Sequence, residues 1–91
     1  MGSGTVANGA NSTTMGYATT SSGTYSTAMG YKTQANGASS TAIGSGSIAN
    51  GANSTTMGYA TTSSGTYSTA MGYKSIANGD ASTAMGSGSI A

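Results

Sequence analysis

Small and larger side chains alternate along this chain in short runs, and each run ends at a glycine. In residues 26–30, Ser-Thr-Ala-Met-Gly, positions one, three and five are small and positions two and four are larger. Alternation with period two is typical of a β-strand, in which successive side chains point to opposite faces. The pattern therefore predicts five-residue strands, each followed by a two-residue turn.

The runs recur every seven residues, and pairs of runs form 14-residue units that start at 5, 19, 33, 47, 61 and 75. Three units make a longer super-repeat, since residues 5–46 and 47–88 match at 35 of 42 positions. Residues 1–91 are therefore interpreted as a single repeat array. Residues 1–4 have the letters and the phase of residues 85–88. We accordingly interpret Met1 as a repeat methionine, with a start methionine as the alternative, and expect the array to be cut from a longer protein.

A period of seven is also typical of a coiled coil, but a glycine in every heptad and the lack of flanking charges exclude that structure. An antiparallel meander competes more seriously, because Asn-Gly, a strong hairpin signal, occurs at Asn8, Asn36, Asn50 and Asn78. We favour a parallel stack, in which equivalent side chains of successive units lie on one another. The predicted fold is an all-β parallel β-solenoid with two short strands per coil.

The positions predicted to point inward carry nothing larger than Thr, so the interior must be thin. We expect the glycine of each run to permit positive φ at the turn and to let the two sheets of a coil approach closely. The predicted turn glycines are Gly9, Gly16, Gly23, Gly30, Gly37, Gly44, Gly51, Gly58, Gly65, Gly72, Gly79 and Gly86.

One outward column is apolar along the whole array. It comprises Met15, Met29, Ile43, Met57, Met71 and Met85. A continuous apolar stripe on a chain otherwise covered by Ser, Thr and Asn is typical of an interaction surface. We predict that this column lines the axis of a homo-oligomer.

The composition narrows the classes of function. Ser, Thr, Gly and Ala fill 64 of the 91 positions, Cys and His are absent, and the only charged side chains are Lys32, Lys74 and Asp80. Metal sites built on Cys or His, disulfides and His-based catalytic triads are therefore excluded, as is a pair of carboxylates within one chain. We expect no enzyme activity, no cofactor, no metal, no nucleic-acid binding and no direct membrane contact, and both lysines are interpreted as solvated.

Six tyrosines fall at predicted turns and are candidate surface contacts. Together with Asn and Ser they resemble the side chains of evolved binding loops, which suggests an extracellular-matrix protein or a glycan as partner. The alternative is that each ring packs over a neighbouring turn and stacks at the 42-residue spacing. One column holds Tyr17, Tyr31, Tyr59 and Tyr73, and another holds Tyr25 and Tyr67.

Two segments carry a family resemblance. Residues 26–32, Ser-Thr-Ala-Met-Gly-Tyr-Lys, and residues 47–53, Ser-Ile-Ala-Asn-Gly-Ala-Asn, resemble the SxAxGxx repeats of YadA-like heads, which belong to trimeric autotransporter adhesins of Gram-negative bacteria. The resemblance extends over essentially all 91 residues. It implies a left-handed parallel β-roll, two further copies as partners in a homotrimer, and display on the bacterial outer membrane.

The expected function is therefore that of a structural and adhesive head segment that attaches to host or environmental surfaces through many weak contacts. One alternative is the shaft or spacer of a phage or viral fibre that uses the same β-roll. A third hypothesis is an ice-binding solenoid, because one strict Thr column runs through positions 13, 27, 41, 55, 69 and 83. We expect that column to be buried, since its neighbours are methionines.

Overall fold

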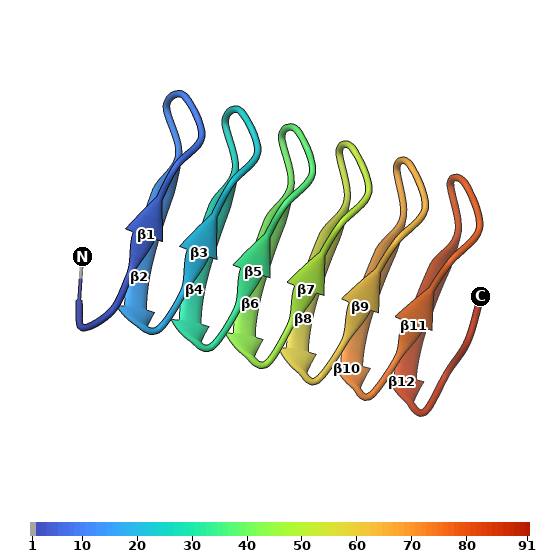
Figure 1. Cartoon of the computed structure of the whole chain (residues 1–91). Coiled ribbons are helices and arrows are strands. Elements are labelled where there is room, and N and C mark those ends of the chain that lie inside the picture. Colours follow the sequence, from blue (N-terminus) through green and yellow to red (C-terminus); the bar gives the residue numbers. More distant parts are fainter. Residues whose placement is uncertain (1) are drawn as a thin grey trace.

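The structure is a computed structural model that describes residues 2–91. Met1, interpreted above as a repeat methionine, lies outside the described residues. Short and long strands alternate along the chain (Figure 1). The short strands are β1 Val6–Ala7, β3 Thr20–Ser21, β5 Gln34–Ala35, β7 Ile48–Ala49, β9 Thr62–Ser63 and β11 Ile76–Ala77. The long strands are β2 Thr13–Tyr17, β4 Thr27–Tyr31, β6 Thr41–Ser45, β8 Thr55–Tyr59, β10 Thr69–Tyr73 and β12 Thr83–Ser87.

The strands form two six-stranded parallel sheets that face each other across a thin interior. The short strands make sheet A, in the order β1-β3-β5-β7-β9-β11, and the long strands make sheet B, from β2 to β12. Every strand pairs with the strand one coil away, so that equivalent residues of successive units lie side by side, as Met15 and Met29 do. The predicted parallel β-solenoid with two strands per coil is confirmed, and the antiparallel meander is wrong (Figure 1).

The prediction of five-residue strands in both halves of each unit is wrong for sheet A. There the strand stops after two residues, because the amides of Asn36 and Gly37 both donate to the carbonyl of Ala49, at 2.8 and 3.1 Å. Two residues opposite one acceptor interrupt the ladder, as in a β-bulge. In sheet B the strands do have five residues, but each starts one residue later than predicted and runs through the glycine.

The interior contains only small side chains. Among residues 2–91 the buried side chains are Ala, Ser and Thr, and buried alanines of the two sheets cluster together, as Ala28, Ala35, Ala42 and Ala49 do. The Cα atoms accordingly extend only 9 Å in the thinnest direction, against 31 and 21 Å in the other two. The predicted thin roll with nothing larger than Thr inside is confirmed.

The glycines act differently from the prediction. Those of sheet B, such as Gly44 with φ of 128°, need positive φ but lie inside strands rather than in turns. Those of sheet A, such as Gly37, lie in the bend and have no positive φ. A Cβ at either position would overlap the carbonyl of the equivalent glycine in the next coil, Gly58 or Gly51. The close approach that requires glycine is therefore between stacked coils and not between the two sheets.

Candidate functional site

The outer face of sheet B carries the apolar column predicted from the sequence, here called the Met column. Its six members pair in register along the sheet, as Met71 does with Met57 and Met85. Their side chains are half-buried to exposed, with 42% of Met15, 38% of Met57 and 61% of Met85 accessible. The Thr column lies two residues before it in every strand, on the same face. The single chain thus presents a continuous Met and Thr surface to solvent.

The outer face of sheet A is more polar and less regular. Val6, Thr20, Gln34, Ile48, Thr62 and Ile76 stack there. Beside them, the side-chain Nδ2 of Asn36 donates to Asn50 Oδ1 at 2.9 Å. Mixed polar and apolar side chains of this kind are typical of a solvent-facing sheet, so the two outer faces of the roll differ in chemistry.

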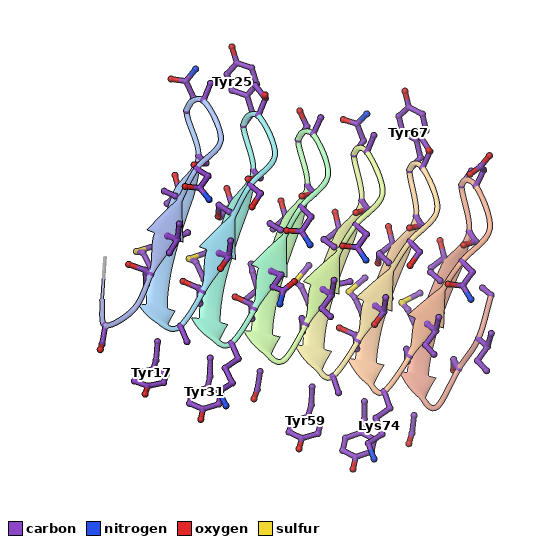
Figure 2. All side chains as sticks on the ribbon, viewed as in Figure 1. Tyr17, Tyr25, Tyr31, Tyr59, Tyr67 and Lys74 are labelled. Carbon is purple, nitrogen blue, oxygen red and sulfur yellow. The ribbon has the colours of Figure 1, made fainter. Side chains whose placement is uncertain are left out.

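The tyrosines that end the long strands form stacked pairs along one edge of the roll, which we call the Tyr edge (Figure 2). The rings of Tyr17 and Tyr31 are 5.3 Å apart between centroids with planes 9° apart, and Tyr59 and Tyr73 are 5.2 Å and 7° apart. Offset stacks of this kind add a modest stabilisation beyond burial. The alternative of stacking at the 42-residue spacing is wrong, because the rings stack between adjacent coils.

Both lysines lie on the Tyr edge and contact these rings. Lys32 Nζ is 5.3 Å from the centroid of the Tyr31 ring, and Lys74 Nζ is 5.2 Å from that of Tyr73. Both lysines are exposed, as predicted, but each ammonium also makes a cation–π contact. The sequence contains Tyr-Lys at both places. The lysine has positive φ, 53° at Lys32, in a column where Gly46 and Gly88 also have positive φ.

The opposite edge, here called the loop edge, consists of the bends that follow the short strands (Figure 2). Tyr25 and Tyr67 lie there, and they are the most exposed tyrosines, at 63% and 65%. Asp80 lies on the same edge and accepts a hydrogen bond from the Thr66 amide at 3.3 Å. The structure therefore separates the predicted tyrosine contacts into two sets, and places the lysines with one set and the carboxylate with the other.

No pocket opens on the surface of residues 2–91, and these residues contain no group of three or more His, Cys, Asp or Glu that could hold a metal ion. No helix in the same part of the chain is long and apolar enough to cross a membrane. The surfaces described above are the Met column, the outer face of sheet A, and the two edges.

Comparison with known proteins supports one family. The model of the YadA head domain repeat, which covers two copies of the repeat, matches residues 7–33, 21–47, 35–61, 49–75 and 63–89. Each match starts one coil of the roll after the previous match. A search of curated proteins found no match. Because the matches together span residues 7–89, the chain belongs to the YadA head domain repeat family.

Proposed function

We propose that three copies of this chain assemble around the Met column into a rod that serves as a structural and adhesive head segment of a trimeric autotransporter adhesin. In this proposal the roll is left-handed, and the rod stands on the outer membrane of a Gram-negative cell and attaches to host or environmental surfaces. Membership of the YadA head domain repeat family supports a surface-exposed segment of the adhesin type. The same match favours the adhesin over a fibre shaft.

The exposed Met column is the observation that carries the assembly. Six Met or Ile side chains in register line the outer face of sheet B, whereas the buried side chains of residues 2–91 are Ala, Ser and Thr. So small an interior buries little apolar surface, which leaves an isolated roll marginally stable. Burial of the column between copies would add about 25 cal/mol for each Å² of apolar surface removed from water. Assembly therefore supplies stabilisation that the interior lacks.

The mass of the protein in solution tests the assembly. We expect light scattering to give three times the chain mass of 8.6 kDa, with a β-rich circular dichroism spectrum. The combined substitution Met29→Asp, Met57→Asp and Met71→Asp should abolish assembly, because it places three charges in the proposed interface. The matched control, Thr20→Asp, Gln34→Asp and Thr62→Asp, adds the same charge to the outer face of sheet A and should leave the mass unchanged. A β-rich parent protein with the mass of one chain would refute the assembly.

Adhesion is tested separately on the assembled protein. Beads coated with the parent protein should adhere to immobilised matrix proteins or to cell layers, and beads coated at equal density with the Met-to-Asp variant should adhere much less. The reason is that three copies on a rod multiply weak contacts, which a dispersed chain does not. Equal adherence by the parent protein and uncoated beads would count against the adhesive part of the proposal.

A further inference from the structure

The ladder of rings on the Tyr edge is interrupted at one level inside the chain. Ser45 pairs in register with Tyr31 on one side and with Tyr59 on the other. A serine thus stands where four other coils have a tyrosine. We name this level the Ser45 step and define it by Tyr31, Lys32, Ser45 and Tyr59.

The interruption leaves two ring faces directed toward the same level. Tyr17 stacks on Tyr31 and Tyr73 stacks on Tyr59, so each inner ring has its second face on the side of Ser45. Neighbouring strands lie about 4.8 Å apart, which places Tyr31 and Tyr59 about 9.6 Å apart along the stack. Rings that are one coil apart are already separated by 5.3 and 5.2 Å between centroids. The Ser45 step therefore has the height that one additional ring requires.

Lys32 brings a positive charge to the same level. Its Nζ is as far from the Tyr31 centroid, 5.3 Å, as the Tyr17 centroid is. The ammonium cannot fit between two stacked rings, so it lies over the face that Tyr31 directs toward Ser45. Asp80, the only acidic side chain, is on the loop edge, so no carboxylate side chain of the same chain lies on the Tyr edge to pair with Lys32.

We propose that the Ser45 step binds an acidic saccharide, through one pyranose ring that carries a carboxylate. The C–H faces of the sugar pack against Tyr31 and Tyr59, whose rings combine an apolar face with a polar hydroxyl. The Lys32 ammonium leaves the Tyr31 ring and donates a charge-assisted hydrogen bond to the carboxylate. The Ser45 hydroxyl is the hydrogen-bonding partner for the sugar hydroxyls. This inference names a ligand class for the proposed function and rests on it for display of the site outside the cell.

The combination of side chains selects this class over simpler ligands. An inorganic anion would use Lys32 and leave both ring faces bare, whereas a neutral sugar would use the rings and leave the charge unpaired. Only a ring that also carries an anionic group engages all four residues. Tyr73, Lys74 and Ser87 repeat three members of the Ser45 step in the second super-repeat, with Lys74 Nζ 5.2 Å from the Tyr73 centroid. The chain thus contains one step with two rings and a related one with a single ring.

Titration with trigalacturonate, and with the same trisaccharide after reduction of its carboxylates, tests the site. We expect the parent protein to bind the acidic probe at least tenfold more tightly than the reduced probe. Ser45→Tyr should lower the affinity for trigalacturonate at least tenfold, because it fills the step with a ring while net charge stays the same. The fold should tolerate this change, since Tyr occupies the same column in four coils. Lys32→Gln should abolish the preference for the acidic probe.

Tyr25→Ser is the matched control, because it removes an exposed tyrosine from the loop edge and should change affinity less than twofold. The inference is overturned if the parent protein binds neither probe, if it binds both equally, or if Ser45→Tyr binds as tightly as the parent. The mass of each sample separates this outcome from the proposed assembly. A parent protein with the mass of three chains that does not bind refutes the saccharide alone. A binding-competent protein with the mass of one chain refutes the assembly and leaves the site standing.

Discussion

Sheet A and sheet B differ at the residues that flank the glycine of the seven-residue pattern. In sheet B, Met or Ile precedes the glycine and Tyr or Ser follows it, and β4 runs through Gly30 to Tyr31. In sheet A, Asn or Ser precedes the glycine, and β5 ends at Ala35, two residues before Gly37. Asn and Ser favour bends, because their side chains hydrogen-bond to nearby backbone, whereas Met continues a strand readily.

The difference shows that one seven-residue pattern can encode two local structures. Sheet B continues its ladder through the glycine, which has positive φ, and its strands end at the next residue. Sheet A ends its ladder at the doubled hydrogen bond and forms the wider loop edge. The structural period is therefore one full coil, which is twice the period of the glycines. The predictions that follow test this distinction, from the largest expected effect to the smallest.

Substitution of the two kinds of glycine should separate conformational strain from steric overlap. Gly44→Ala is expected to lower the free energy of unfolding by about 4 kcal/mol or more, because its Cβ overlaps the Gly58 carbonyl and its φ of 128° is almost restricted to glycine. Gly37→Ala causes the same kind of overlap, but Gly37 has no positive φ, so this change should lower the free energy of unfolding by about 3 kcal/mol. Denaturant unfolding at a fixed protein concentration measures both.

The last coil supplies the controls for these substitutions. A Cβ at Gly86 would meet only the Ser89 hydroxyl, at 3.2 Å, so Gly86→Ala tests mainly the positive φ and should have an intermediate effect, about 1–2 kcal/mol. A Cβ at Gly79 would meet only the Ser82 side chain, at ordinary contact distance, and Gly79 has no positive φ. Gly79→Ala should therefore be nearly neutral. Equal effects of Gly37→Ala and Gly79→Ala would contradict the stacking explanation.

Enlarging the interior should destabilise the roll from either sheet. Ala42→Val on sheet B and Ala49→Val on sheet A both add two methyl groups' worth of volume at fully buried positions. Overpacking of this kind costs about 1–3 kcal/mol. The lower end is expected at Ala42, because the next coil holds the equally large Thr56 buried in the same column. Thermal unfolding is the measurement. Unchanged midpoints for both variants would mean that the interior is looser than the structure indicates.

Buried hydroxyls offer a finer comparison between the sheets. Ser63 on sheet A donates to the Thr55 carbonyl on sheet B at 2.7 Å, whereas the hydroxyl of Ser68, before β10, has no hydrogen-bond partner among residues 2–91. Ser63→Ala should therefore lower the free energy of unfolding by about 1 kcal/mol, and Ser68→Ala should leave it unchanged or raise it slightly. Both substitutions remove one hydroxyl oxygen, so equal losses of unfolding free energy in denaturant would contradict the different hydrogen bonding of the two serines.

The smallest effect is expected on the outer face of sheet A. Asn50→Ser removes the acceptor of the 2.9 Å hydrogen bond from Asn36, but the pair is exposed. The expected loss is about 0.5 kcal/mol, and Ser is compatible with the fold because Ser22 and Ser64 occupy the same column. Asn78→Ser, where no such hydrogen bond is present among the described residues, is the control. A loss above about 1 kcal/mol at Asn50 would show that this ladder contributes more than its exposure suggests.

Periodicity predicted the parts of the fold that depend on repetition. Columns of equivalent residues predict parallel stacking and a coil of two seven-residue runs. They also predict the small inward side chains and the outward position of Met57. The unequal strands were not predicted, because the choice between strand and bend depends on two amides that share the Ala49 carbonyl. Such a hydrogen bond joins residues in different coils. Its sequence signal is the Asn or Ser before the glycine in sheet A, which a seven-residue pattern shared by both sheets does not separate from the Met or Ile of sheet B.

The candidate sites were predicted unevenly for the same reason. The column positions of Tyr31 and Tyr59 are visible in the sequence, but the stacking partner of each ring depends on the direction in which the ring leaves the strand. Lys32, which contacts Tyr31, has a left-handed backbone conformation that residues other than Gly, Asn and Asp seldom adopt. The sequence signals are the adjacency of the two residues and the glycines, such as Gly46, in the lysine column.

The glycine columns also restrict how such a chain can change length. Because a Cβ on the column glycines ahead of the last coil would overlap the backbone of their counterparts in the next coil, an insertion or deletion that puts another residue in a glycine's place would set a side chain against a carbonyl in the coil where it falls. Duplication or loss of a whole unit preserves every contact. A change in length by whole coils, about 4.8 Å each, therefore keeps both glycine columns in register, and recombination between near-identical units could produce it.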